Sequence, residues 1–317
     1  MATIAENIQT LKSIKSDIKN AIIQKGGSVT DAFGTYAQAI TDLPSGGGGG
    51  TEIEDALITR TLSEYSNDRI SRVGVGAFAY YSNLASIDLQ NCRYVDNSAF
   101  VNCTKLIYVS LPLCEIISSY AFSYCIELQS LDLPNCRFVY YGGFQSCYEL
   151  NSVNLPNCSY ISNDGFNGCS NLVSIDLPLC EYATFGMFSK CLKLAYVSLP
   201  LCRTIGGYAF SSCHALPSID FPNCKIVDYY AFKYCSALSI VKLQNCSYFG
   251  SSAFDSCFNL KEVYLNSVSS VTTIFSTTFN NCSNLTSVYV PASLVDAFKT
   301  ARNWSSISDK IVAYTEA

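Results

Sequence analysis

The sequence has few of the residues that catalysis and membrane insertion require. Among 317 residues there is a single histidine, His214, and only 14% of the chain is charged. No run of 18 apolar residues occurs, so no segment suits a transmembrane helix. The formal net charge is −5 without clusters of lysine or arginine, which argues against nucleic acid and anionic membranes as partners, because both need a basic footprint.

Sorting signals are also missing from both ends of the sequence. The N-terminus, MATIAENIQTLKSIKSDIKN, lacks the basic region, apolar core and small-residue cleavage site of a secretory signal. The C-terminus, KIVAYTEA, has no anchor. We therefore expect a protein that is made in the cytoplasm and stays there until assembly or lysis releases it.

One 22-residue unit is present in abundance, and LASIDLQNCRYVDNSAFVNCTK at Leu84–Lys105 is a typical copy. A phenylalanine column runs from Phe78 to Phe254 at this spacing without a slip. Two cysteine columns share the period, and a last cysteine, Cys282, follows 25 residues after Cys257. A constant period in the range of about 20–29 residues is typical of a solenoid in which each coil packs on its neighbours.

The unit itself predicts how each coil folds. Leu84, Ile87 and Leu89 alternate with polar residues, which predicts a short strand with one buried face. We expect the chain to bend after this strand, to turn inward again at Phe100, and to stack its phenylalanines as a buried aromatic column. Stacked coils then form a parallel sheet from the strands.

The repeat resembles the BspA-like branch of leucine-rich repeats. The hallmark Ala-Phe-x-x-Cys-x-x-Leu-x-x-Ile-x-Leu-Pro reads AFSYCIELQSLDLP at 121–134 and AFSSCHALPSIDFP at 209–222. The resemblance extends from Leu62 to Asn284 and implies a β-rich solenoid of 22-residue coils. One departure is the cysteine at Cys92 and its equivalents, where the commoner form carries a small or β-branched residue.

Seventeen cysteines raise the question of disulfides and metals. The number is odd, and every cysteine falls in one of the two columns. Parallel side chains in a ladder stay about 4.8 Å apart, whereas a disulfide needs Cβ atoms about 3.8 Å apart. We therefore expect free, buried thiols that act as small hydrophobes, with ladder disulfides as the alternative. No CxxC motif occurs, so we expect no metal and no cofactor.

The segment before the repeats predicts a small α-helical module at 1–43. An apolar stripe with near-helical spacing predicts a helix at 3–24. We expect this helix to support oligomerisation, for example as a trimer, or docking on a partner. The stripe comprises Ile4, Ile8, Leu11, Ile18 and Ile22. A second helix is expected at 31–40. Residues 44–50, a proline, a serine and five glycines, read as a linker.

This N-terminal segment resembles the opening of tail-associated structural proteins of bacteriophages and prophages. The shared features are an Ile/Lys/Ala helix, the KGG turn at 25–27, the Tyr-Ala-x-x-Ile pattern at 36–40 and a glycine-rich exit. The resemblance implies attachment to other virion or tail proteins through residues 1–43. The remaining organisation is a solenoid with its N-terminal cap at 51–284 and a C-terminal cap at 285–317, with a helix over 294–301 and a buried Trp304.

No catalytic constellation is evident, and we expect no enzyme. His214 is expected to face solvent rather than to pair with a thiolate. Asp88 and its equivalents Asp132, Asp176 and Asp220 recur only in every second coil, about 10 Å apart, which is too far to share a proton or a calcium ion. They are expected to form a solvated polar face.

The outward columns vary and are rich in tyrosine, serine, asparagine and glycine. Tyrosine in that company gives rigid amphipathic area at low entropic cost, as in antibody paratopes, and it also suits stacking on sugar rings. The alternative is that aromatic residues merely suit a β-rich surface. The candidate ligand-binding residues are Tyr94, Tyr108, Tyr120, Tyr124, Tyr141, Tyr160, Tyr182, Tyr196, Tyr208, Tyr229, Tyr230 and Tyr234.

The function expected from these features is binding without catalysis. The concrete hypothesis is a phage or prophage tail-associated adhesin, located in the virion tail after assembly in the bacterial cytoplasm, that recognises a bacterial surface glycan or protein. Two alternatives remain open: a structural virion component that packs on other particle proteins, and a bacterial surface adhesin of BspA type.

Overall fold

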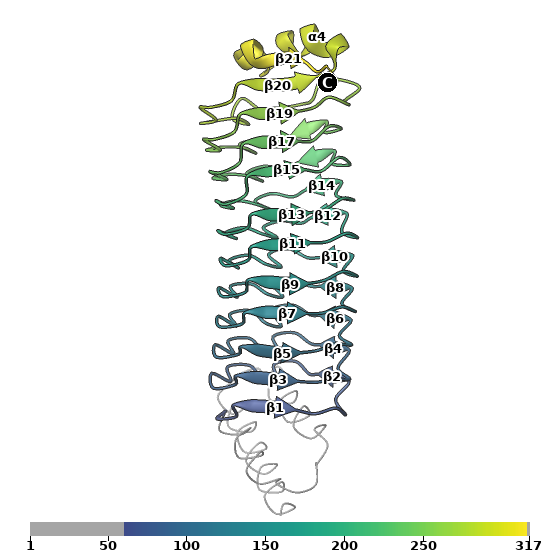
Figure 1. The fold of residues 1–317 in the computed structure, drawn as a ribbon, viewed down its shortest axis with the longest axis vertical. Coiled ribbons are helices and arrows are strands. Elements are labelled where there is room, and N and C mark those ends of the chain that lie inside the picture. Colours follow the sequence, from purple (N-terminus) through teal and green to yellow (C-terminus); the bar gives the residue numbers. More distant parts are fainter. Residues whose placement is uncertain (1–59, 316–317) are drawn as a thin grey trace, which may run out of the picture.

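The computed structural model describes residues 60–315, and this part of the chain forms a solenoid of about eleven parallel-strand turns (Figure 1). The repeat solenoid expected from the sequence is thereby confirmed. The helical module expected at 1–43 and the linker at 44–50 lie outside the described residues.

Each coil contributes a short strand to a first wall, and its central residue points into the core. In β3 (Ser86–Asp88) the buried residue is Ile87, which pairs in register with Val109 of the next coil. The strand is shorter than the expected six residues, because the Leu84 amide donates to Tyr81 O within its own coil. The other strands of this wall are β1 (Glu64–Ser66), β5 (Tyr108–Ser110), β7 (Ser130–Asp132), β9 (Ser152–Asn154), β11 (Ser174–Asp176), β13 (Tyr196–Ser198), β15 (Ser218–Asp220), β17 (Ile240–Lys242), β19 (Glu262–Tyr264) and β20 (Ser287–Val290).

A second wall carries two-residue strands where the sequence had predicted only a bend. Here β4 (Tyr94–Val95) pairs in parallel with its neighbours, and Val95 is buried. Two residues are too few for a periodic pattern, so this second sheet could not be predicted from the sequence. Its other strands are β2 (Arg72–Val73), β6 (Ile116–Ile117), β8 (Phe138–Val139), β10 (Tyr160–Ile161), β12 (Tyr182–Ala183), β14 (Thr204–Ile205), β16 (Ile226–Val227) and β18 (Tyr248–Phe249).

The rest of each coil, here called the back wall, forms backbone hydrogen bonds although it contains no β-strand. Successive backbone amides donate alternately to a carbonyl of the next coil and to a carbonyl of their own coil. The Phe100 amide donates to Ala121 O at 2.8 Å, whereas the Ala99 amide donates to Asp96 O. This alternation requires a positive φ twice in most coils, as at Ser98 (56°) and Asn102 (58°). Two positions per coil therefore favour glycine, asparagine or aspartate.

The expected aromatic column is confirmed. From Phe78 to Phe254, neighbouring phenylalanine rings stack with centroids 5.0–5.8 Å apart, and none is more than 2% exposed. Burying each ring contributes roughly 1.5–3 kcal/mol, so this column carries much of the stability.

The seventeen cysteines are free thiols, and sixteen of them are buried. They do more than fill space as small hydrophobes. In the column that includes Cys103 and Cys125, each thiol donates to the carbonyl of the phenylalanine in the preceding coil, as from Cys125 to Phe100 at 3.2 Å. In the other column most thiols donate to the carbonyl two residues ahead, as from Cys92 to Tyr94 O. Both columns therefore satisfy backbone acceptors in the interior.

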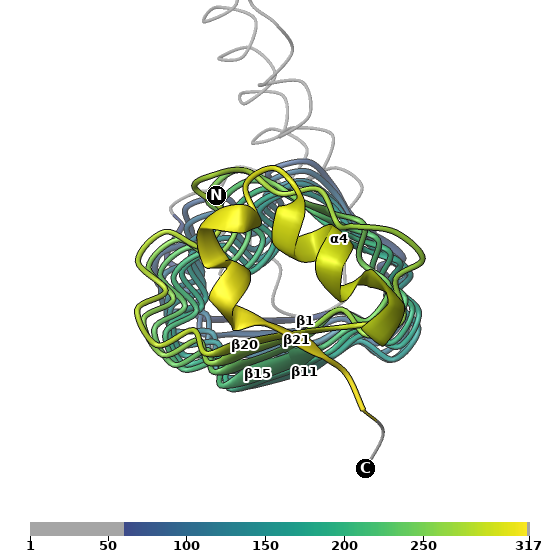
Figure 2. The same ribbon diagram turned by 90° about the horizontal axis from the view of Figure 1, so that it is seen from above.

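A compact cap covers the C-terminal end of the solenoid (Figure 2). After β20 come η1 (Ala292–Leu294), α4 (Val295–Thr300), η2 (Ser305–Lys310) and β21 (Ile311–Ala313), which pairs with β20. Trp304 is fully buried, and its indole N–H donates to Thr272 O at 2.6 Å. Among the helices of residues 60–315, none is long and apolar enough to cross a membrane.

Candidate binding surface

The structure divides the twelve candidate tyrosines among three faces. Tyr94, Tyr160 and Tyr182 lie on the outside of the second wall, whereas Tyr108 and Tyr196 stand on the outside of the first wall, four coils apart. All five are exposed. The structure does not bring these five together into one compact site.

The other seven share the back wall and its edge, and we call this surface the tyrosine face. Two members were missed by the sequence reasoning, Tyr80 and Phe185, both exposed. The 22-residue spacing could have found them, since Tyr80 shares a column with Tyr124, and Phe185 shares one with Tyr141. The tyrosine face comprises Tyr80, Tyr120, Tyr124, Tyr141, Phe185, Tyr208, Tyr229, Tyr230 and Tyr234.

The densest part of the tyrosine face lies over three successive coils. Tyr208 is its centre, with ring centroids 5.7 Å from Phe185, 5.6 Å from Tyr229 and 5.0 Å from Tyr230. Edge-to-face and stacked pairs at such distances are worth about 0.5–1.5 kcal/mol each. The rings therefore hold one another in place and present a preordered aromatic surface.

Glycines make room for these rings. A Cβ at Gly207 would lie 2.9 Å from the ring of Tyr229, and one at Gly142 would lie 3.0 Å from the ring of Tyr120. Gly142 also has a φ of +59°, which an L side chain rarely adopts. The rings of Tyr120 and Tyr229 thus lie directly on the backbone of an adjacent coil.

A second pair, Tyr120 and Tyr141, packs edge to face at 5.1 Å. A hydrogen bond with Tyr120, together with a hydrogen bond and charge from Asp164, raises the pKa of Tyr141 to about 12. The Tyr141 phenol is therefore neutral and able to donate at physiological pH.

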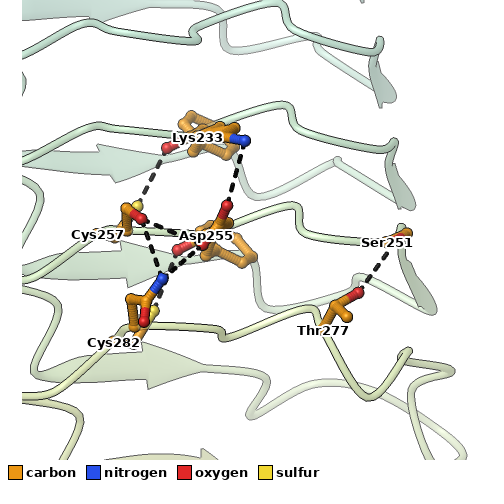
Figure 3. Close-up of polar contacts among 10 residues, drawn as sticks. Lys233, Ser251, Asp255, Cys257, Thr277 and Cys282 are labelled. Carbon is orange, nitrogen blue, oxygen red and sulfur yellow. Dashed lines mark hydrogen bonds and ion pairs between the residues drawn. The ribbon is translucent and has the colours of Figure 1, made fainter.

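One cation is built into this surface. The ammonium of Lys233 lies 4.7 Å from the ring centre of Tyr230 and 4.8 Å from that of Tyr234, so it joins two columns of the tyrosine face. It also pairs with Asp255 at 3.3 Å, which in turn accepts from Asn281 (Figure 3). Burial is the largest single effect and lowers the pKa of Lys233, but the hydrogen bonds and charges of Asp255 and Tyr234 together outweigh it, so the pKa is raised. Lys233 stays charged and fixed between the rings.

The backbone under the tyrosine face is the most informative feature. Six of its tyrosines have φ between 55° and 65°, in the left-handed region: Tyr80, Tyr120, Tyr124, Tyr208, Tyr230 and Tyr234. Other coils fill the same two columns with residues that tolerate this region better, such as Asn102, Asp164 and Gly186. The left-handed conformation costs an L residue other than glycine roughly 1–2 kcal/mol. Folding alone therefore does not select tyrosine at these positions.

No group of three or more histidine, cysteine, aspartate or glutamate side chains lies close enough to hold a metal ion in the described residues, 60–315. His214 is exposed, as expected. Asp132, Asp176 and Asp220 also face solvent, on the first wall.

Comparison with known proteins identifies the repeat. The family model described as BspA type leucine rich repeat region matches residues 61–128, 93–202 and 184–306. Similar solved structures include a leucine rich cell surface protein of Faecalibacterium prausnitzii, at 20% identity over 78% of this chain and 82% of that chain, with a TM-score of 0.41. A leucine-rich repeat protein of Bacteroides ovatus has 21% identity over 78% and 88%, with a TM-score of 0.37.

The pneumococcal vaccine antigen PcpA is also similar, at 16% identity over 80% of each chain, with a TM-score of 0.43. A search of the curated proteins finds no match. The matched family segments together cover residues 61–306, which is well over half of the chain. The protein therefore belongs to the BspA-type leucine-rich-repeat family.

Proposed function

We propose that this protein is a non-enzymatic recognition protein whose tyrosine face binds a protein on the surface of a bacterial cell. The observation that carries the proposal is the set of six tyrosines at positive φ. The bonding between coils imposes this conformation, so tyrosine kept there at a cost to folding points to a role in binding. The exposed rings of Tyr124 and Tyr234 add little to the core but offer contact area to a partner.

The shape and composition of the tyrosine face favour a protein partner. It extends along the solenoid, and Tyr120 and Tyr230 lie five coils apart, about 24 Å at ~4.8 Å per coil. That length suits a standard protein interface of about 800 Å² per partner. Preordered tyrosines among serine and glycine are typical of paratopes, which bind protein surfaces with little loss of side-chain entropy.

The setting that we propose is the tail of a phage or prophage particle. Support comes from the resemblance of the first 45 residues to tail-associated proteins. In this proposal residues 1–43 attach the protein to the virion or form a trimer, and the solenoid recognises the host. Display of several copies would raise avidity by about 10²–10⁴ without any new contact.

The family match supports a second candidate, an adhesin on the surface of the bacterium that makes the protein. The two candidates predict different locations. An antibody against the solenoid should label purified phage particles in the first case and intact cells of the producing strain in the second.

The test of recognition is binding of the labelled full-length chain to a panel of bacterial strains. The test variant carries residues that other coils place in the same columns, namely Tyr124→Asn, Tyr208→Gly, Tyr230→Ser and Tyr234→Ser. The control variant, Tyr108→Ser with Tyr196→Ser, removes two exposed tyrosines from the first wall. Loss of about 2 kcal/mol at a hot spot corresponds to roughly 30-fold weaker binding.

We expect the test variant to bind at least 30-fold more weakly and the control to bind like the native protein. Treating the cells with protease should abolish binding, whereas periodate should leave it intact. Equal binding by the test variant and the native protein would overturn the role of the tyrosine face. If periodate abolished binding and protease did not, the target would be a glycan and not a protein.

A further inference from the structure

A second surface feature lies near the C-terminal end of the first wall, on β17, β19, β20 and the segment after β21 (Figure 1). It is a groove of about 430 Å³, within the range of ~300–1,000 Å³ that is usual for small-molecule sites. Three tyrosines, two amides and a lysine line it: Lys242, Gln244, Tyr264, Asn266, Tyr289 and Tyr314.

The aromatic part of the groove consists of two stacked tyrosine rings and a third ring that packs edge-on beside them. Tyr264 and Tyr289 are paired in register on β19 and β20, and their ring centroids lie 4.6 Å apart at an interplanar angle of 23°. Tyr314 packs edge-on to Tyr264 at 6.3 Å. On the other side of Tyr264 the register partner is Lys242, which also lines the groove.

Departures from the repeat are concentrated at this place. At the position occupied by Lys242 and Tyr264, six earlier coils carry aspartate, serine or asparagine, and two residues later the same six coils have proline. The coils of β17 and β19 instead have Gln244 and Asn266 at that later position. Larger polar and aromatic side chains therefore stand here at positions where those six coils carry short polar residues and proline.

The charges in the groove are already balanced by the protein. The Lys242 ammonium lies 3.9 Å from the Asp220 carboxylate. The Tyr264 hydroxyl donates to Glu262 at 3.0 Å. Burial, followed by this hydrogen bond, raises the pKa of Tyr264 to about 12, so the phenol keeps its proton and its position.

One polar group in the groove wall has no partner. The Oδ1 atom of Asn266 is buried and accepts no hydrogen bond from the residues that the structure describes. An unsatisfied buried acceptor costs about 1–3 kcal/mol. A ligand that supplies a donor to this oxygen would remove that cost.

We propose that this groove binds the pyranose ring of a neutral saccharide. A pyranose offers an apolar C–H face that suits the tyrosine rings lining the groove. Its hydroxyl groups both donate and accept, which matches the amides of Gln244 and Asn266 and the Lys242 ammonium. A neutral sugar fits better than an acidic one, since Asp220 already compensates the lysine. This site is separate from the tyrosine face.

Saturation-transfer NMR on the full-length chain tests the proposal with glucose, galactose, mannose, N-acetylglucosamine and glucuronic acid as probes. The test variants are Tyr264→Ser and Lys242→Ser, which restore residues of earlier coils. The control is Tyr108→Ser on the same wall, six and more coils away. Thermal melts establish that each variant is folded, and Tyr264→Phe keeps the ring if Tyr264→Ser unfolds.

We expect saturation transfer to at least one neutral sugar, at least a tenfold weaker signal in Tyr264→Ser, and a native signal in Tyr108→Ser and Tyr264→Phe. The four-tyrosine variant of the tyrosine face should bind the sugar normally. Absence of transfer to all five sugars, transfer to glucuronic acid alone, or an undiminished signal in Tyr264→Ser would overturn the proposal. None of these outcomes bears on binding by the tyrosine face.

Discussion

The Cys147 thiol donates a hydrogen bond to the carbonyl oxygen of Phe122 in the preceding coil, with 3.1 Å between Sγ and oxygen. The same carbonyl accepts from the Cys125 amide at 3.1 Å. Each phenylalanine carbonyl in this column thus receives one bond from its own coil and one from the next. The cysteine column is a ladder that joins successive coils beside the stacked rings.

Replacing one thiol of this ladder should lower stability. Cys147→Ala removes the donor and leaves a small void at a fully buried site, so we expect a loss of about 1–2 kcal/mol in the free energy of unfolding. Urea denaturation measures the change. Cys282→Ala is the matched control, because Cys282 makes the same bond to Phe254 but is only half-buried. A cost at Cys147 no greater than at Cys282 would contradict a packed interior ladder.

Alkaline pH should destabilise the fold. Burial raises the pKa of Cys147 to about 12 and that of Cys103 to about 12, against an ordinary value of 9.0. Above about pH 9 the unfolded chain releases thiol protons that the folded chain keeps, so stability is complete below pH 9 and falls as pH rises toward 12. We expect the urea midpoint to fall steeply between pH 9 and pH 11, and less steeply in Cys147→Ala. A constant midpoint would mean that the thiols titrate normally in the fold.

The sequence predicted the repeat architecture because each coil has the same inward residues. A period of 22 residues identified the buried columns of phenylalanine and cysteine, and alternation around Ile87 identified the first wall. The second wall escaped prediction, since a pair such as Tyr94–Val95 is too short for a periodic signal. The hydrogen bonds of the thiols were not predicted either, because a cysteine in a buried column of a sequence is interpreted as a small apolar residue.

Truncating one ring of the aromatic column should be costly. Phe144 stacks on Phe122 and Phe166 and is fully buried. Phe144→Ala should therefore lower the free energy of unfolding by about 3–5 kcal/mol. The exposed Phe258 provides the control, and Phe258→Ala should change stability by no more than about 0.5 kcal/mol. Similar urea midpoints for the two variants would show that the stacked phenylalanine rings contribute little to stability.

The candidate sites were only partly predictable. Most residues of the tyrosine face were predicted from the sequence, but so were tyrosines such as Tyr108 that stand alone. The position of a residue in the repeat does not show which columns lie side by side on one face of the solenoid. The positive φ at Tyr124 follows from bonds between coils and is invisible in one coil. The groove at Tyr264, Tyr289 and Tyr314 was missed, since it forms where the repeat breaks down and the cap adds a residue from far along the chain.

If the tyrosine face is a binding surface, its tyrosines are kept for binding against the conformational preference of the backbone. Tyr124 tests this directly: its φ is 61°, its side chain is exposed, and the neighbouring coil has Asn102 at the same position with a φ of 58°. Asparagine tolerates this region better than tyrosine. Tyr124→Asn should therefore leave the fold intact and leave the melting temperature unchanged or slightly higher.

The decisive measurement pairs that melting temperature with the affinity of the same variant for bacterial cells. The account predicts a melting temperature at or above that of the native protein, together with binding that is weakened by about tenfold, or about 1.4 kcal/mol. Native affinity combined with a lower melting temperature would show that Tyr124 serves the fold rather than recognition, and would contradict the account.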